Sequence, residues 1–315
     1  MERAYQTKSF DMDQIAATIG TFDGVHLGHR SLINKLLQES VVRSLPPAVI
    51  TFDVPPISVV APKRPYLLLT TLAEKQRLLD DMGIRVITLH FDKEMASMDA
   101  ERFMEEVLSD VYGVKYLLIG YDHRFGHNRT QDFDDYKRIG HALGIELGRG
   151  PQLNVQAEPI SSSRIRKLLN SAQIQEANSL LGYHYTLSGK VVGGMRVGRT
   201  LGFPTANIHV DSRHKLLPPH GVYGVRIKYD NACHDGMLYI GSRPSLDNGS
   251  HVTIEVNIFN INANLYDKEL TLEFVFFERP DHKFDTLDEL RAQISADQAS
   301  IMSKLHHYKL HFPAR

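Results

Sequence analysis

Short apolar runs alternate with helix-like spacing of apolar residues as far as about residue 180. The runs are typical of strands buried on both faces, and they occupy residues 15–22, 48–52, 85–91 and 115–120. The segments between them place apolar residues at i, i+3 and i+4, which predicts helices at 31–41, 71–82, 100–111 and 132–143. This alternation predicts a parallel sheet with helices on both faces, which binds ligands at the carboxyl ends of its strands.

The remainder of the chain has a different pattern. Its β-rich segments are punctuated by Gly, Pro and Asn, and they lie at 185–192, 222–229, 237–240, 252–258 and 270–277. Together they predict a small antiparallel barrel, followed by one amphipathic helix over 285–306. Residues 171–181 look helical and Gly182 is suited to cap them, so we expect two domains, 1–181 and 182–315.

Composition narrows the function classes. With 315 residues, 42% hydrophobic and 23% charged, the chain is typical of a folded protein of one or two domains. Cys233 is the only cysteine, which excludes an internal disulfide and a cysteine-cluster zinc site. No membrane-length apolar run and no signal-peptide pattern occur, so we expect a cytoplasmic protein with no membrane partner. A net charge of −1 argues against nucleic-acid binding but leaves small-molecule substrates open.

The first strand-to-helix turn carries the first candidate chemistry. It runs Gly20-Thr21-Phe22-Asp23-Gly24-Val25-His26-Leu27-Gly28-His29, and we expect a helix to begin at about His29. The free N–H groups of a helix N-terminus bind anions, and glycines let a phosphate approach the backbone closely. His26 and His29 are three residues apart, so both can face one phosphoryl group. The alternatives are a glycine-rich turn with surface histidines, or a zinc site with Asp23 as third ligand.

A second feature also favours phosphate binding. Ser161-Ser162-Ser163-Arg164-Ile165-Arg166 precedes an apolar helical pattern, and serines there can cap the helix. Cations in a first helical turn oppose the helix dipole, so Arg164 and Arg166 are unfavourable there unless an anion offsets them. The alternative is a capped helix with solvated arginines.

A glycine-rich stretch in the second half is the third candidate. Residues 189–208 hold five glycines, which can turn backbone N–H groups toward an anion, but no Walker A motif. Thr205 and Asn207 share one face of an extended segment and offer the hard oxygen ligands that Mg²⁺ prefers. Glu255 shares a predicted strand face with Thr253 and Asn257. A glycine-rich hairpin and a solvated strand face are the alternatives without chemistry.

The first two motifs together resemble the nucleotidyltransferase superfamily. More narrowly, G-x-F-D-G-V-H-x-G-H followed by S-S-S-R-I-R is similar to the N-terminal half of bacterial bifunctional riboflavin kinase/FAD synthetases. The resemblance implies a Rossmann-like domain in which His26, His29 and Arg164 act on ATP phosphates. It implies nucleotide contacts from Gly20, Phe22, Asp23, Gly24, Gly28, Ser162, Ser163 and Arg166. It also implies that Asp122, Arg124 and Phe125 help to form the flavin pocket.

The third motif extends the same resemblance. G-R-x-L-G-F-P-T-A-N-I resembles the signature of riboflavin kinases. The resemblance implies that Thr205 and Asn207 hold Mg²⁺ and ATP, and that Glu255 is the general base for the ribityl hydroxyl of the flavin. It implies nucleotide contacts from Gly198, Gly202 and Pro204. Arg279 and Arg291 become candidates for flavin contact near the last helix.

Local departures from the family pattern bear on affinities and on the relative strength of the two activities. Val54-Pro55-Pro56 stands where the family usually has Pro-His-Pro, so one histidine expected near ATP is missing. His123 replaces a frequent Phe, and Tyr239 stands where Asn is frequent.

The resemblance implies two sequential reactions. Riboflavin would be phosphorylated by ATP to FMN, and AMP would then be transferred from ATP to FMN, giving FAD and pyrophosphate. Two alternatives remain open: a riboflavin kinase whose N-terminal domain only binds nucleotide, and a flavin carrier without catalysis.

Overall fold

The computed structural model describes residues 14–311, apart from 122, 128, 156, 195, 196, 231, 245–249 and 262. The chain forms two units. We call the first, Met1–Leu67 with Thr71–Ile160, the sheet unit, and the second, Leu68–Thr70 with Ser161–Arg315, the barrel unit.

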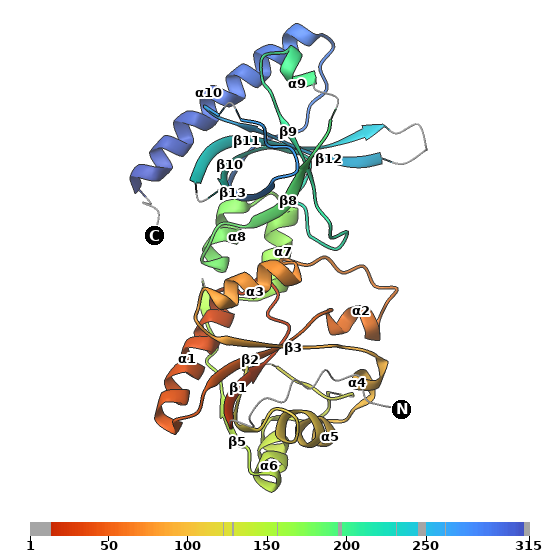
Figure 1. Ribbon diagram of the computed structural model, residues 1–315, viewed down its shortest axis with the longest axis vertical. Helices are drawn as coiled ribbons and strands as arrows, with labels where there is room; N and C mark the ends of the chain where they lie inside the picture. The colour runs from red at the N-terminus through yellow and green to blue at the C-terminus, as the bar shows by residue number, and fades with distance from the viewer. Residues whose placement is uncertain are drawn as a thin grey trace. The chain divides into compact units, whose positions relative to one another are not determined.

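A five-stranded parallel sheet forms the centre of the sheet unit (Figure 1). Its strands are β1 (Ile15–Ile19), β2 (Pro47–Phe52), β3 (Arg85–Leu89), β4 (Val114–Ile119) and β5 (Glu146–Arg149). All five residues of β1 are buried because helices cover both faces of the sheet. The predicted parallel sheet is confirmed, and so are its four apolar strands.

The helices of the sheet unit pack on two faces. They are α1 (Leu27–Arg43), α2 (Pro56–Val60), α3 (Leu72–Asp80), α4 (Lys93–Ser97), α5 (Ala100–Arg102), the π-helix η1 (Phe103–Ser109) and α6 (Phe133–Leu143). Leu36 of α1 and Leu79 of α3 pack on one face of the sheet. Met104 of η1 and Ile139 of α6 pack on the other. A short antiparallel pair, β6 (Asn154–Val155) and β7 (Glu158–Pro159), completes the unit.

Strand order explains where this unit can bind a ligand. The strand order is β3-β2-β1-β4-β5. From β1 the chain adds β2 and β3 on one side, and it then crosses to the other side of β1 to add β4 and β5. The direction of strand addition therefore switches between the neighbouring strands β1 and β4. A ligand site is expected where the direction switches, beyond the carboxyl ends of the strands. The turn after β1 begins at Gly20 and the loop after β4 begins at Gly120. Both predicted motifs of this unit therefore leave the sheet at its switch point.

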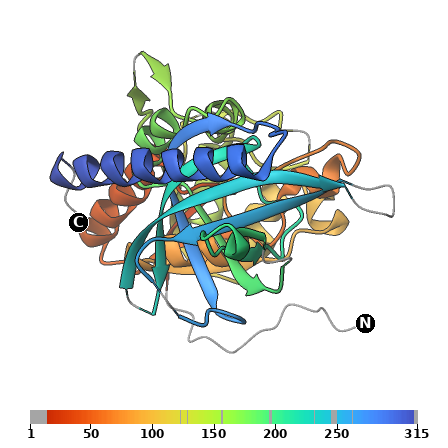
Figure 2. The same cartoon turned by 90° about the horizontal axis from the view of Figure 1, so that it is seen from above.

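The barrel unit is a closed antiparallel barrel with a long helix on its outside. Its strands are β8 (Thr186–Val192), β9 (Ala206–His209), β10 (Gly221–Tyr229), β11 (Ala232–Pro244), β12 (Ser250–Ile258) and β13 (Glu269–Pro280), in the spatial order β10-β11-β12-β9-β8-β13. Its helices are α7 (Ser162–Asn170), α8 (Ile174–Leu181), α9 (Val197–Thr200) and α10 (Leu287–His311). Figure 2 shows α10 lying across the barrel strands, where Ile301 and Leu305 pack against Val222 and Val275. The predicted barrel and terminal helix are confirmed.

Several predicted boundaries were wrong. The first helix begins at Leu27 rather than near His29, because His26 already caps it. The first strand ends at Ile19 rather than at Phe22, since Phe22 adopts a positive φ of 48°. The predicted helix over 100–111 is a single turn followed by the π-helix η1.

Helices α7 and α8 group with the barrel, which places the break between the two units at Ile160 and Ser161. The side-chain amide of Asn178 on α8 connects this segment to the barrel, because both its N–H group and its oxygen form hydrogen bonds. Its Nδ2 donates to the carbonyl of Phe274 on β13 at 2.8 Å, and its Oδ1 accepts from the Tyr185 N–H at 2.8 Å. The left-handed cap at Gly182 is present as predicted.

We predict that Asn178→Ala destabilises the barrel unit by about 2 kcal/mol, because two part-buried backbone groups lose their partner. Chemical denaturation followed by circular dichroism measures this cost. Gln175→Ala, at an exposed position on the same helix, is the control and should change the stability by less than about 0.5 kcal/mol. Equal stability of the two variants would contradict the assigned role of Asn178.

Candidate active sites

The histidine turn is built around the first residue before α1. His26 is the N-cap, and its Nδ1 accepts a long hydrogen bond of 3.4 Å from the backbone N–H of His29. This acceptor role leaves the proton of a neutral His26 ring on Nε2. The two imidazoles stack with centroids 3.7 Å apart. The turn therefore presents two imidazoles beside the N–H groups of a helix N-terminus, an arrangement that suits an anion.

The backbone of this turn is strained but firmly anchored. Phe22 and Val25 have positive φ angles of 48° and 35°, which are unfavourable for side chains of these types. Both side chains are buried in the core beneath α1, so packing over-determines the conformation. A Cβ on Gly28 would lie 3.1 Å from the His26 ring, so glycine allows the imidazole to lie close to the helix backbone.

Burial governs the charge of His29. It lowers the pKa of His29 well below the usual value, and the nearby His26, His123 and Lys75 lower it further. The ring is therefore neutral near pH 7 in the free protein. Its Nδ1 is buried and makes no hydrogen bond to any described residue. A phosphate placed here would favour protonation of His29, since an adjacent anion stabilises the charged imidazole.

A buried lysine, Lys75 of α3, lies under the same turn. Its Nζ donates to Thr51 Oγ1 and to the carbonyl of Phe52, both at 2.9 Å, and to the carbonyl of Thr21 at 3.2 Å. The ammonium thus connects the ends of β1 and β2. Burial lowers the pKa of Lys75 to about 8, although Asp23 and Asp53 nearby act in the opposite direction. No sequence pattern assigned a role to Lys75.

The sheet unit contains a cavity of about 380 Å³ at this edge of the sheet. Apolar side chains from β2, α2, α4 and η1 line it together with the loop that follows β4. Arg124 and Phe125 both line the cavity, whereas the predicted Asp122 lies outside the described residues. The Tyr136 hydroxyl holds this loop, since it accepts from the Phe125 N–H at 2.9 Å and donates to its carbonyl at 2.8 Å. A flat aromatic ligand suits these walls.

The Val54-Pro55-Pro56 departure lies at the same cavity. Pro55 and Pro56 line it where the family pattern has a histidine. Just before them, Asp53 accepts the N–H groups of Val54 and Phe91 and pairs with His90 Nδ1 at 2.6 Å. The pair raises the pKa of His90 through this hydrogen bond and the charge of Asp53. Asp53 therefore joins the ends of β2 and β3.

The serine-arginine motif opens α7 as predicted. Ser161 is the N-cap, and its hydroxyl accepts the N–H of Arg164 at 3.3 Å. Ser162, Ser163, Arg164 and Arg166 occupy the first two turns. The helix dipole alone does not favour two arginines there, so the prediction of an anion at this end keeps its physical basis.

Two cavities in the barrel unit share one residue. The larger, of about 530 Å³, lies between barrel strands and the start of α10 and includes Glu255. The second, of about 460 Å³, is lined by the glycine-rich segment, by Asn207 and by residues near Tyr266. Thr205 lines both cavities. A group bound in one cavity can therefore meet a group bound in the other at Thr205.

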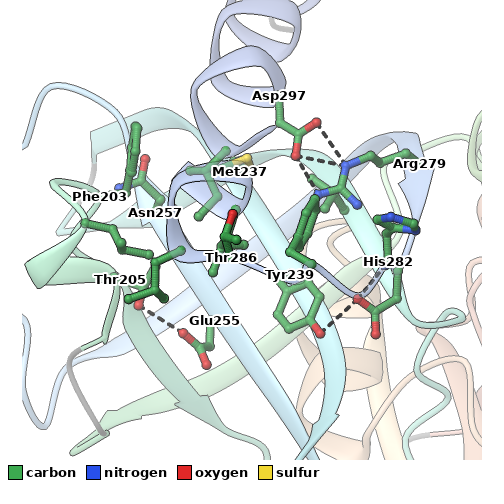
Figure 3. Close-up of a pocket in the computed structure, with 18 of the residues that line it drawn as sticks. Phe203, Thr205, Met237, Tyr239, Glu255, Asn257, Arg279, His282, Thr286 and Asp297 are labelled. Atoms are coloured by element: carbon green, nitrogen blue, oxygen red, sulfur yellow. Dashed lines mark hydrogen bonds and ion pairs between the residues drawn. The ribbon is translucent and has the colours of Figure 1, made fainter. Parts of the chain in front are cut away.

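Figure 3 shows the polar groups at this meeting point. Thr205 Oγ1 donates to Glu255 Oε2 at 3.1 Å. Asn207 lies directly opposite Glu255 in the pairing of β9 with β12. Asn257, one pleat further along β12, donates to the Pro204 carbonyl at 2.7 Å, while its buried Oδ1 makes no hydrogen bond to a described residue. Hydroxyl, carboxylate and amide oxygens thus gather here, and this donor set fits Mg²⁺.

The glycine-rich segment packs directly on these oxygen donors. A Cβ on Gly194 would lie 2.2 Å from Asn207 Nδ2, and one on Gly198 would lie 2.4 Å from the Phe203 carbonyl. Gly198 also lines the larger cavity and Pro204 the smaller, and Gly202 has a φ of 89° that favours glycine. These glycines keep the backbone close to Thr205 and Asn207.

The two arginine candidates have different surroundings. Arg279 lines the larger cavity and forms a bidentate ion pair with the buried Asp297, with Nε 3.0 Å from Oδ1 and Nη2 2.8 Å from Oδ2. Its guanidinium therefore fixes α10 to the end of β13. Arg291 is exposed and is not among the residues that line the cavity. Tyr239, identified from the sequence only as a departure from the family pattern, lines the cavity and donates a hydrogen bond to Asp281. Asp281 also lines the cavity and was missed.

Across the part of the chain that the structure describes, no helix combines the length and apolar character needed to cross a membrane. Among the same residues, no three His, Cys, Asp or Glu side chains gather closely enough to hold a metal ion.

Comparison with known proteins covers both units. A family model described as FAD synthetase matches residues 9–164, and one described as riboflavin kinase matches residues 181–305. A bifunctional riboflavin kinase/FMN adenylyltransferase of Escherichia coli is 35% identical over 283 residues, which cover 89% of this chain and 90% of the relative. One from Haemophilus influenzae is 34% identical over 284 residues, covering 90% and 91% of the two chains.

A solved structure supports the same arrangement of elements. The crystal structure described as a macrolide-efflux protein from Streptococcus pneumoniae has a TM-score of 0.84 and 29% sequence identity, and it covers 92% of this chain and 94% of its own.

The depressed pKa of Lys75 leads to a stability prediction. The folded protein releases this proton at a pH of about 8, whereas the unfolded chain keeps it to about pH 10.4. Between these values the unfolded state binds more protons, so the unfolding free energy rises with pH. Relative to Lys75→Met, the wild-type free energy of unfolding should rise by up to about 1.4 kcal/mol per pH unit in this window.

Urea unfolding at several pH values between 7 and 10 tests the Lys75 prediction. Lys35→Met removes a surface lysine that pairs with Glu39, and it should show no such rise against the wild type. A constant difference between wild type and Lys75→Met across the window would refute the prediction.

Proposed function

The chain belongs to the family of bifunctional riboflavin kinase/FMN adenylyltransferases, and we propose that it carries out both reactions in its two units. It phosphorylates riboflavin with ATP to give FMN, and it transfers AMP from ATP to FMN to give FAD and pyrophosphate. The main support for this proposal is that the residues matched by each family model line a separate cavity. Groups suited to phosphate binding lie near each of these cavities. Because both reactions consume ATP, we propose a cytoplasmic location.

For the kinase reaction, riboflavin occupies the larger barrel cavity and ATP the smaller. Glu255 takes the proton of the terminal ribityl hydroxyl, and that oxygen attacks the γ-phosphorus of ATP. ADP leaves and FMN remains. The hydrogen bond from Thr205 fixes Glu255 Oε2, so the other carboxylate oxygen can accept the proton. Pro204 lines the nucleotide cavity, and Gly198 lies beside Thr205, where the two cavities meet. We propose that both contact the nucleotide together with Gly202.

Thr205 and Asn207 would hold the magnesium ion of ATP, and the oxygen donor set described above supports this assignment. When bound, Mg²⁺ supplies positive charge that neutralises the phosphates during transfer. Arg279 contributes through its ion pair with Asp297, which keeps α10 against the flavin cavity. Arg291 is the weaker flavin candidate because its side chain is exposed.

For the adenylyl transfer, a phosphate oxygen of FMN attacks the α-phosphorus of ATP, and pyrophosphate leaves. This in-line substitution needs no covalent enzyme intermediate, so the protein positions the reactants and stabilises charge. His26 and His29 provide imidazole N–H groups next to the helix N-terminus, and Arg164 provides a guanidinium. The family motifs support nucleotide contacts from Gly20, Phe22, Asp23, Gly24, Gly28, Ser162, Ser163 and Arg166. Arg124 and Phe125 contact the flavin.

We assign residues 1–181 to adenylyl transfer and residues 182–315 to the kinase. The family models support this division, because one ends at 164 and the other begins at 181. Helices α7 and α8 group with the barrel although the serine-arginine motif of the first reaction lies on α7.

We predict that two single substitutions separate the activities. His29→Ala should stop at FMN when riboflavin and ATP are supplied, because the phosphate contact in the sheet unit is lost. Glu255→Gln should form FMN more slowly by about 10²- to 10⁴-fold, the usual contribution of a general base, while still converting supplied FMN to FAD. Chromatography of the flavin products in the presence of Mg²⁺ measures both effects.

The controls are His141→Ala on α6 and Glu269→Gln on β13, which change exposed residues of the same types. Both should produce FMN and FAD at wild-type rates. Wild-type protein that stops at FMN would support the alternative of a monofunctional kinase. Bound flavin without any product would favour the carrier and reject the enzyme.

A further inference from the structure

Tyr239 links two walls of the larger barrel cavity. It lies on β11 directly opposite Glu255 on β12, and its side chain lines the cavity beside that carboxylate. Its hydroxyl donates to Asp281 Oδ1 at 3.1 Å, as the dashed line in Figure 3 shows. One side chain therefore contacts both the strand pair that carries the proposed base and the segment that follows β13.

That segment, residues 281–286, forms a wall of the cavity. Asp281, His282, Phe284, Asp285 and Thr286 all line it, and all except Phe284 are exposed. An exposed connection with little buried surface is easily displaced. Its position therefore depends on the few contacts that hold it.

The segment is held at both ends. Before it, Arg279 is fixed by the bidentate ion pair with Asp297 of α10. After it, the Thr286 hydroxyl accepts the Glu289 N–H at 3.2 Å and starts α10. Among the described residues, the bond from Tyr239 is the hydrogen bond that joins the segment to the barrel strands. Asp281 Oδ1 also accepts the His282 N–H at 2.9 Å, which fixes the direction of the carboxylate.

Local structure keeps the phenol in this position. A Cβ on Gly241 would lie 2.1 Å from the Tyr239 oxygen, so only glycine at 241 leaves room for the ring in its present place. Burial raises the pKa of Tyr239 to about 12, and the charge of Asp281 and the hydrogen bond to it add to this effect. The hydroxyl therefore remains a donor throughout the range of pH in which enzymes of this kind are assayed.

We propose that Tyr239 is a positioning residue for riboflavin: its ring bounds the cavity next to Glu255, and its hydroxyl holds residues 281–286 against the bound flavin. This inference rests on the proposed kinase function of the barrel unit. A residue with this role acts mainly on binding, because the ring alone suffices to keep the flavin beside Glu255. Loss of the hydroxyl therefore raises KM for riboflavin more than it lowers kcat.

The test compares full-length wild type with Tyr239→Phe, Asp281→Ala and the double variant, at saturating ATP. Each single variant should raise KM for riboflavin about tenfold, the size expected for one hydrogen bond to a charged group at a partly exposed site. kcat should stay within about threefold of wild type. The double variant should be no worse than either single variant, because both remove the same bond.

Internal controls separate a local effect from misfolding. Conversion of supplied FMN to FAD, which we assign to residues 1–181, should be unchanged in every variant. Tyr229→Phe removes a hydroxyl at the end of β10, away from the cavity, and should leave KM for riboflavin unchanged. Tyr239→Asn also removes the ring, so it should lower kcat in addition to raising KM.

An unchanged KM in Tyr239→Phe, or effects of the two single variants that multiply in the double variant, would overturn the inference. Quenching of riboflavin fluorescence gives the same test without turnover, with an expected tenfold rise in Kd for Tyr239→Phe. Wild-type protein that binds riboflavin but makes no FMN would refute the proposed function, while the Kd comparison would still decide the role of Tyr239.

Discussion

The proposed chemistry of both sites requires positive and polar groups that are already in position when a polyphosphate binds. In water such groups would have to be reorganised during the reaction, whereas a folded site holds them in place. On the roles proposed above, the sheet unit meets this need with a helix N-terminus capped by His26 and with His29 stacked beside it. The barrel unit would meet it through oxygen groups of Thr205, Asn207 and Glu255, which lie at its two cavities and suit the magnesium ion of ATP.

Holding these groups in place has an energetic cost that the cores offset. Phe22 and Val25 keep unfavourable backbone angles, which typically cost about 1–3 kcal/mol each. Lys75 keeps an ammonium buried, with hydroxyl and carbonyl oxygens as its hydrogen-bond partners. All three positions lie where β1 and β2 leave a sheet whose strands are buried on both faces. The unfavourable backbone angles of the turn are thus stabilised by packing against the buried strands of the sheet.

Much of the fold could be predicted from sequence because buried strands leave a clear apolar signal. β5 and β9 were missed because Glu146–Arg149 and Ala206–His209 are short and mixed in polarity. The start of α1 was misplaced because histidine is an unusual N-cap, and its role depends on a hydrogen bond that no sequence pattern specifies. The motif residues were found on the expected turns. Tyr239 with Asp281 and Asp53 with His90 could not be predicted, because each pair is distant in sequence.

The departures from the family pattern that line a cavity belong to its walls rather than to the groups to which we assign chemistry. Pro55, Pro56 and His123 line the cavity of the sheet unit, and Tyr239 lines that of the barrel unit. The two imidazoles of the turn and the Thr205–Glu255 pair remain in place. Wall residues set how tightly a substrate fits, whereas the transition state is stabilised by the polar groups. We therefore propose that these departures alter the affinity for flavin and nucleotide, while the groups assigned to the two reactions are retained.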